Sequence, residues 1–552
     1  MKPPRWLRPA AAATASAVLL AGLAACSASS SASSASGVIV NVISAGSAIQ
    51  RVFNPYLPVD AFGQGGTSEI QGLIYESLAE VSQIKADDDK PWLATSWQWS
   101  ADGKALHFNL RHGVKWTDGK PFTSADVVFS YNAIKQNPAL DLRGLSFGTV
   151  KADGPYGVNF TFTQQSTQTF DDLVQLEIVP KHIYADKGNL TKFTDPNPVG
   201  TGPFELASFS NQSFLLKKNP HYWQPGKPQI GGLRFSTVRD NNAVTEALVE
   251  GQADWASAFV ANVKQTLLSK NPDLHIFWPV VGSDGLITNN ASFPFNDLQV
   301  RKAVSLAISR KQIAAVAERG PATSAIGLPM PVFKDDIAPD LKNAVYQHSI
   351  TKALALLHQD GYTKGSNGQL EKNGRPLAFT ITIPQAFTEQ VAAAQVVQAQ
   401  LAPLGIKVAV QGVAVDAIDG LTGKGEFQAT FGYPIATQTV AYNLYNAWSN
   451  PMYARPVGQA IPTKEDIQRT ESPVLQSYFN NYLAATSDAA RKQALYDIER
   501  FWVNNVPWIV CSYYQKYGDY STAKVTGWPS ASDPYWAADV NPVVALQLKP
   551  VK

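Results

Sequence analysis

The sequence predicts an α/β protein built from two or more lobes. Short strand patterns alternate with helical patterns along the whole chain, and this alternation is typical of α/β layers. A single hydrophobic core rarely supports a chain of 552 residues, so at least two lobes are expected. No period of about 20–50 residues recurs, which argues against a solenoid.

The expected strands are short apolar or alternating runs, and the expected helices show apolar residues at helical spacing. Strands are predicted at 38–43, 105–110, 157–162, 377–383 and 406–410. Helices are predicted at 68–81, from a cap at Thr123 or Ser124 onward, and at 242–250, 300–308, 388–404 and 489–502. Gly251 and Gly405 follow two of these helices as expected C-caps.

The N-terminus has the order of features found in a secretory signal peptide. Lys2, Arg5 and Arg8 form a positive region, and 10–22 is apolar but shorter than the ~20 residues that a membrane-spanning helix needs. We therefore expect 1–25 to be a signal peptide. No sustained apolar stretch of ~18 residues occurs after it.

Cys26 follows Leu23-Ala24-Ala25, a pattern that resembles the bacterial lipobox, in which this thiol is acylated. The region 26–37 is almost entirely Ser and Ala after the cysteine and is expected to be a flexible tether. The protein is therefore expected outside the cytoplasm, held on the cell membrane by lipid alone. The remaining cysteine, Cys511, lies in an apolar run and is expected to be buried rather than reactive.

Composition excludes several classes of partner and activity. Once the three basic residues of the signal peptide are removed, 43 basic and 44 acidic residues remain, and no basic run occurs. Nucleic-acid binding needs a clustered basic excess and is therefore not expected. The 7 His are scattered, so no metal site or cofactor is predicted, although a nickel complex bound through a carrier ligand is left open.

An enzyme is also not expected. Residues 144–148 match the Gly-x-Ser-x-Gly nucleophile pattern, but they follow a predicted helix and precede a strand, which is the wrong context for that motif. No paired carboxylates or activated nucleophile can be recognised. No Walker motif is present either, so any ATP-driven step belongs to another protein.

Six segments, in order, resemble the family 5 extracellular solute-binding proteins of ABC importers. The first runs from Pro91-Trp92-Leu93-Ala94-Thr95-Ser96-Trp97 to the stretch 106–128, which contains Val114-Lys115-Trp116-Thr117-Asp118-Gly119-Lys120-Pro121-Phe122. The others are Val199-Gly200-Thr201-Gly202-Pro203-Phe204, Asn219-Pro220-His221-Tyr222-Trp223, Leu248-Val249-Glu250-Gly251-Gln252-Ala253-Asp254, 294–303 and Leu404-Gly405-Ile406-Lys407-Val408. Most of these residues are expected to be scaffold, with Gly200 and Gly202 placed where φ is positive.

The resemblance implies a two-lobed periplasmic-binding-protein-like fold of type II, similar to cluster C, with an extra subdomain inserted in the first lobe. The first lobe is expected to combine 38–66, 190–286 and 512–552. The inserted subdomain is expected at 67–189 and the second lobe at 287–511. The implied protein is a monomer that captures a solute between its lobes and delivers it to permease subunits served by a separate ATPase.

The resemblance also implies ligand-binding residues. These are Phe53 and Asn54 after the first strand, Trp255 after the Leu248–Asp254 motif, Asn289, and Tyr513 after the second cross-over.

The stretch 431–448 is a further expected part of the site. It is read as a lining loop because its aromatics follow no clear helical period, and an aromatic core cluster is the alternative. Its aromatics are Phe431, Tyr433, Tyr442, Tyr445 and Trp448.

The solute class stays open at this point. Peptide binders of the family hold the ligand ammonium with an Asp in the second lobe, but 430–443 contains no acid. A peptide-like solute is the main hypothesis. A neutral oligosaccharide, or another neutral solute, is the alternative within this class, with sugar rings stacked on aromatics. A secreted lipoprotein sensor, adhesin or hydrolase is the alternative from another class.

Overall fold

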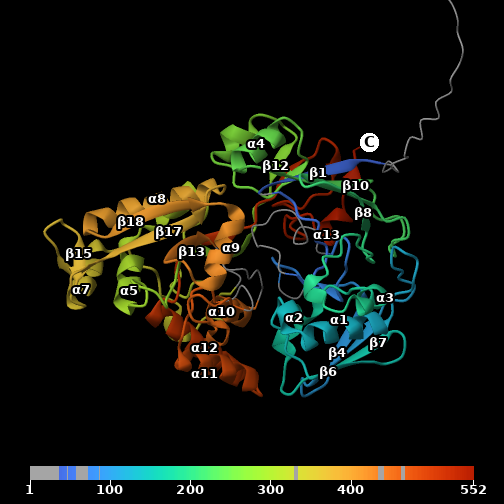
Figure 1. The fold of residues 1–552 in the computed structure, drawn as a ribbon, viewed down its shortest axis with the longest axis horizontal. Coiled ribbons are helices and arrows are strands. Elements are labelled where there is room, and N and C mark those ends of the chain that lie inside the picture. The colour runs from blue at the N-terminus through green and yellow to red at the C-terminus, as the bar shows by residue number, and fades with distance from the viewer. Residues whose placement is uncertain are drawn as a thin grey trace, which may run out of the picture. The chain divides into compact units, whose positions relative to one another are not determined.

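The computed structural model describes residues 37–46, 48–57, 72–85, 88–328, 333–432, 440–461 and 466–551 (Figure 1). The predicted signal peptide, Cys26 and Tyr433 lie outside these residues. In the described ranges, strands and helices alternate, and the strands form a seven-stranded, a five-stranded and a four-stranded sheet together with three small sheets of two or three strands.

The first large sheet has seven strands in the order β12-β21-β11-β1-β10-β9-β8. Its centre is β1, which pairs in parallel with β10 on one side and with β11 on the other. Helix α4 (Asn241–Val249) packs on β1. The bounds are β1 (Ile39–Ala45), β8 (Phe204–Phe209), β9 (Ser213–Lys218), β10 (Gly232–Val238), β11 (Trp255–Ala256), β12 (Leu274–Ile276) and β21 (Asp519–Ser521).

A four-stranded antiparallel sheet, β4-β5-β7-β6, lies inside the predicted insert. Its strands are β4 (Ala94–Trp99), β5 (Ala105–Leu110), β6 (Thr149–Ala152) and β7 (Gly157–Thr161). Helix α1 (Ser124–Gln136) packs on β6 and β7. Thr123 caps α1 in a capping box with Asp126, which confirms the predicted helix start.

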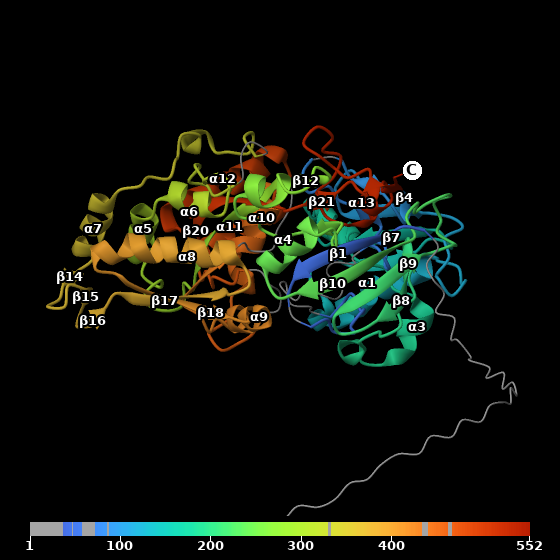
Figure 2. The same cartoon turned by 90° about the horizontal axis from the view of Figure 1, so that it is seen from above.

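The second large sheet has five strands in the order β18-β17-β19-β13-β20. Its strands are β13 (Val280–Thr288), β17 (Ala378–Pro384), β18 (Lys407–Val413), β19 (Ala429–Gly432) and β20 (Ile509–Gln515). Helix α8 (Thr388–Leu401) packs along β17 and β18 (Figure 2). A 3₁₀ turn and Gly405, at φ 85°, follow α8 where the sequence predicts the helix end.

In the described ranges, the remaining short strands form one three-stranded sheet and two two-stranded sheets. The short strands are β2 (Ala79–Glu80), β3 (Lys90–Pro91), β14 (Thr363–Lys364), β15 (Leu370–Lys372), β16 (Arg375–Pro376), β22 (Val525–Thr526) and β23 (Lys549–Pro550). The helices are α2 (Phe170–Val174), α3 (Lys181–Tyr184), α5 (Leu298–Ala307), α6 (Arg310–Val316), α7 (Ile350–Gln359), α9 (Val415–Lys424), α10 (Ala441–Ser449), α11 (Pro473–Ala484), α12 (Asp488–Asn505) and α13 (Pro542–Ala545). Within the described ranges, none of the helices combines the length and apolar character needed to cross a membrane.

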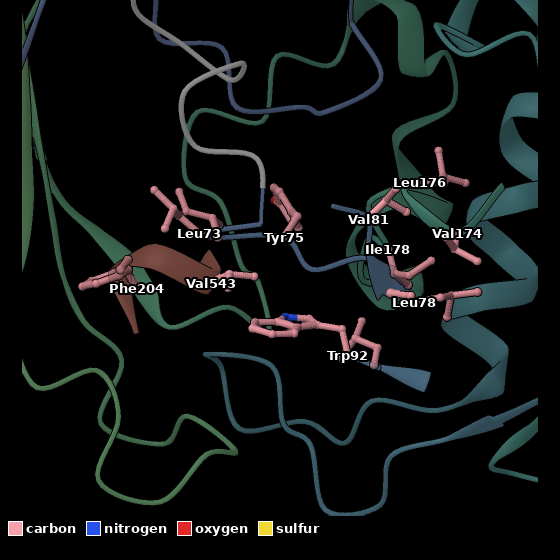
Figure 3. Packing of buried hydrophobic residues seen from close by; sticks show 14 of the residues in the cluster. Leu73, Tyr75, Leu78, Val81, Trp92, Val174, Leu176, Ile178, Phe204 and Val543 are labelled. Atoms are coloured by element: carbon pink, nitrogen blue, oxygen red, sulfur yellow. The ribbon is translucent and has the colours of Figure 1, made fainter. Parts of the chain in front are cut away.

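Buried apolar side chains form separate cores around the two large sheets. One core contains residues of the seven-stranded sheet, the insert and the C-terminal segment, so the insert shares its core with the first sheet. Figure 3 shows part of it, where Leu78 and Val81 lie near Val174, Leu176 and Ile178. Two further cores serve the five-stranded sheet and the helices α10–α12. The strands of the seven-stranded sheet lie in the segments predicted as the first lobe, whereas β13 and β20 of the five-stranded sheet cross the predicted boundaries at 286/287 and 511/512. The proposed domain boundaries stay predictions.

The helix predicted at 68–81 is wrong for its described part, 72–81, which consists of turns and strand β2. The backbone carbonyls of this segment accept long-range hydrogen bonds in place of helical ones. Ile74 O accepts from Gly202 N at 2.9 Å, Leu73 O from Phe204 N at 3.1 Å and Glu76 O from Ile178 N at 2.9 Å. Tertiary pairing therefore overrides the helical spacing of the apolar residues.

The reason predicted for Gly200 and Gly202 is also wrong, because neither has a positive φ. A Cβ on Gly200 would lie 1.7 Å from Ile74 O, and one on Gly202 would lie 2.4 Å from Leu73 O. The glycines are required because two backbone segments approach each other closely here.

Candidate functional site

A cavity of about 280 Å³ lies where the first sheet, the insert and the C-terminal segment meet. It approaches the volume of a small-molecule site, and charged and polar groups supply much of its surface. Its walls come from segments far apart in sequence. The lining residues are Gly72, Ser77, Glu80, Val81, Gln83, Arg143, Gln175, Glu177, Phe235, Trp255, Ser257, Lys516, Trp536, Asp539, Val540 and Asn541.

Among the described residues that the sequence analysis predicts to bind ligand, Trp255 lines this cavity. It lies on β11, next to the central strand β1 of the first sheet, and is 5% exposed. Its Nε1 donates a hydrogen bond to Ala538 O at 3.0 Å, which fixes the indole against the C-terminal segment. A held indole offers a rigid apolar surface to a ligand.

Two of the charged cavity residues form a close ion pair. Lys516 Nζ lies 2.7 Å from Asp539 Oδ2 and also donates to Gln83 Oε1 at 3.4 Å. Lys516 directly follows β20, in the segment that leads from the five-stranded sheet to β21 of the seven-stranded sheet. This pair therefore ties three separate chain segments together at the cavity wall.

Two further carboxylates are less completely paired. Glu177 Oε1 lies 3.7 Å from Arg143 Nη2, and Glu80 Oε1 accepts from Ser77 Oγ at 3.2 Å. Burial raises the pKa of Glu80 to about 8, and the neighbouring Glu76 and Glu177 add to the shift. Burial also raises the pKa of Glu177, although Arg143 opposes the effect.

A carboxylate behind the cavity wall has a structural role. Glu76 Oε1 accepts from Trp92 Nε1 at 2.7 Å, Tyr222 OH at 2.8 Å and Trp223 Nε1 at 3.0 Å. Burial raises its pKa to about 7 despite these bonds. The Asn-Pro-x-Tyr-Trp motif at Asn219 thus supplies donors to a buried acid, in keeping with the scaffold role that the sequence predicts for it.

A second polar cluster joins elements of the two large sheets. Arg319, after α6, forms a buried ion pair with Asp284 of β13, and its Nε and Nη2 donate to Tyr517 OH at 2.9 and 2.7 Å. Asn241 Nδ2 at the start of α4 donates to Glu389 Oε2 of α8 at 2.9 Å. These contacts fix the strands that connect the sheets and link a helix of one to a helix of the other.

Three other predicted ligand residues have structural partners. Phe53 packs edge-on against Phe209 and Phe214 in the core of the first sheet. Asn54 Nδ2 donates to Leu190 O and Phe193 O, and Asn289 Nδ2 donates to Gly425 O and Phe427 O. The structure does not bring these residues into the cavity that Trp255 lines.

The lining loop predicted at 431–448 is wrong for its described C-terminal part, which is helix α10. Trp448 packs against Trp502 and Trp508, and Tyr445 OH donates to Ile326 O at 2.7 Å, so both lie in the hydrophobic core. Phe431 is buried in the core of the five-stranded sheet. This part of the stretch therefore fits the alternative of an aromatic core cluster.

Tyr513 is half-buried on β20 beside Thr323, and its role in binding stays a prediction. Cys511, also on β20, is fully buried, which confirms that part of its prediction. Burial raises the pKa of its thiol to about 11.

Sequence reasoning missed the charged cavity residues. Glu80, Arg143, Glu177, Lys516 and Asp539 stand in no recognisable motif and are brought together only by the fold. The sequence signal that pointed to this cavity was the position of Trp255 directly after the Leu248–Asp254 motif. Among the described residues, no group of three or more His, Cys, Asp or Glu is arranged to hold a metal ion.

Comparisons with known proteins agree on the family. The model of the bacterial extracellular solute-binding proteins, family 5, matches residues 90–453, more than half of the chain. The glutathione-binding protein of Escherichia coli K12 is 30% identical over 336 residues, which cover 59% of this chain and 61% of that protein. The dipeptide-binding protein of the same strain is 31% identical over 350 residues, covering 57% of this chain and 62% of that protein. The matches thus span about three fifths of these relatives.

Solved structures show the same fold. The oligopeptide-binding protein of Thermotoga maritima, with mannohexaose bound, aligns with a TM-score of 0.83 at 20% identity and covers 93% of this chain and 99% of its own. The oligopeptide-binding protein AppA of Bacillus subtilis, with a nonapeptide, aligns with a TM-score of 0.78 at 19% identity, covering 94% and 100%. They confirm the two-lobed periplasmic-binding-protein-like fold. The chain belongs to the bacterial extracellular solute-binding proteins, family 5.

Proposed function

We propose that this protein captures a peptide-like solute outside the cytoplasm and delivers it to the permease of an ABC importer. The observation that carries the proposal is the mixed-charge cavity beside Trp255, which contains both carboxylates and cations. A zwitterionic peptide needs partners of both signs, because a buried unpaired charge is costly. The glutathione-binding and dipeptide-binding relatives support the same solute class.

The proposal assigns no catalytic step to this chain. Energy for import would come from a separate ATPase, and we expect the chain to act as a monomer.

We further propose that Cys26 is acylated and anchors the protein to the cell membrane. If Cys26 is the anchor, the unmodified protein should be retained in the membrane fraction and the Cys26→Ser variant should not. Equal retention of both forms would overturn the anchor.

An oligosaccharide is the second candidate. Two observations favour it: 430–443 contains no acid, and the similar Thermotoga maritima structure holds mannohexaose. In this alternative, neutral hydroxyl groups would have to satisfy the charged side chains of the cavity, which is less favourable than pairing with charges of the ligand.

Thermal unfolding of the purified protein with a panel of solutes tests the proposal. Trialanine, dialanine and glutathione are expected to raise Tm, because a ligand that binds only the folded state stabilises it by mass action. At a free ligand concentration of 100 Kd the expected stabilisation is about 2.7 kcal/mol. A rise with mannohexaose alone would replace the peptide proposal by the oligosaccharide one, and no rise with any solute would contradict both.

A further inference from the structure

We propose that the cavity binds a positively charged group of the solute, an ammonium, at the carboxylates of Glu80 and Glu177. This inference rests on the proposed capture of a peptide-like solute and names the residues that receive its amino terminus. It places that contact on the side of the first sheet and the insert, not on the second lobe.

The charge balance of the cavity favours an added cation. The described ionisable side chains that line it are three acids and two bases. Asp539 and Lys516 neutralise each other at 2.7 Å. Glu80 and Glu177 then share Arg143 as the remaining cation of the described lining, and the cavity has one excess negative charge once Glu80, whose pKa burial raises to about 8, has released its proton. A single ligand ammonium balances it.

The two carboxylates are only loosely paired with groups of the protein. The ion pair from Arg143 Nη2 to Glu177 Oε1 is 3.7 Å long, beyond hydrogen-bond distance, although the Glu177 side chain is only 7% exposed. Glu80 has a long bond from Ser77 Oγ, 3.2 Å. A carboxylate offers several acceptor positions and an ammonium has three donors, so the two groups complement each other.

The Glu80 carboxylate can be reached from inside the cavity. Glu80 is half-buried and lines the cavity, so part of its surface is reachable from inside it. Trp255 lines the same cavity, and aromatic rings attract ammonium groups by their quadrupole. The raised pKa of both acids agrees with carboxylates that lack a close positive partner.

Calorimetric titration with two matched peptides tests the inference. Trialanine has a free ammonium and N-acetyl-trialanine does not, while the rest of the two molecules is the same. The protein is expected to bind trialanine at least tenfold more tightly. Glu80→Gln and Glu177→Gln should each weaken trialanine binding about tenfold or more and leave the affinity for the acetylated peptide unchanged. Both variants remove a charge at nearly constant volume, and their unfolding temperatures show that they fold.

Glu205→Gln is the matched control, because Glu205 pairs with Lys217 at 3.0 Å on the first sheet and does not line this cavity. It should bind both peptides as the unmodified protein does. If the Glu80 and Glu177 variants keep the full preference for trialanine, the inference is overturned while peptide capture stands. If the unmodified protein binds neither peptide, peptide capture and the inference fall together.

Discussion

Replacing Gly200 by Ala is expected to lower the free energy of unfolding by about 4 kcal/mol or more, enough to prevent folding at growth temperature. The added Cβ would lie 1.7 Å from Ile74 O and 2.5 Å from Ile74 C. Both are backbone atoms, and the hydrogen bond from Gly202 N to Ile74 O holds that segment in place. The clash therefore cannot be relieved by a side-chain rotation. Denaturant unfolding followed by Trp fluorescence measures the loss.

Gly420→Ala is the control for this variant. Gly420 lies in α9, has an ordinary φ, and has no atom within 4 Å of the position of an added Cβ. Alanine is favoured over glycine in a helix by about 1 kcal/mol, so this change should be neutral or stabilising. Equal stability of Gly200→Ala and Gly420→Ala would show that the close approach of 74 and 200 is not present in the protein.

Replacing Arg319 by Met is expected to cost about 3–5 kcal/mol of unfolding free energy, because it leaves a buried carboxylate without its cation. The Arg319 and Asp284 side chains are 2% and 4% exposed. The guanidinium also bonds Tyr517 OH and lies 5.3 Å from the centres of the Tyr514 and Tyr517 rings. Thermal and denaturant unfolding measure the effect.

The double variant Asp284→Asn with Arg319→Met separates loss of charge pairing from loss of packing. It removes the stranded carboxylate, so it should recover part of the stability that Arg319→Met alone loses. Arg500→Met, at an exposed pair with Asp340 and Asp497, is expected to change stability by less than about 1 kcal/mol. A double variant that is no more stable than the single one would contradict the role of the buried pair.

The sequence predicted well those elements whose signal is local. The alternation in 105–110 corresponds to β5, and the Thr123 cap begins α1 as expected. The segment 72–81 was misread because its carbonyls accept hydrogen bonds from distant residues, those of Leu73, Ile74 and Glu76 from residues more than a hundred positions away. The apolar spacing of that segment reflects burial in the shared core and not a helical face.

The candidate site was predictable only in part. Trp255 was found because a motif precedes it, whereas Glu80, Glu177 and Lys516 have no local pattern and meet only when the insert and the C-terminal segment fold against the first sheet. In 441–449 the aromatics at 442, 445 and 448 do follow a helical spacing, and they serve the core. Aromatic content by itself did not distinguish a core helix from a ligand surface.

A crystal structure of the protein with the peptide that raises Tm most would locate the solute and show whether it binds beside Trp255. We expect one peptide per chain, in contact with Trp255 and with its ammonium within hydrogen-bond distance of Glu80 or Glu177. A peptide bound entirely outside this cavity would contradict the proposed binding site.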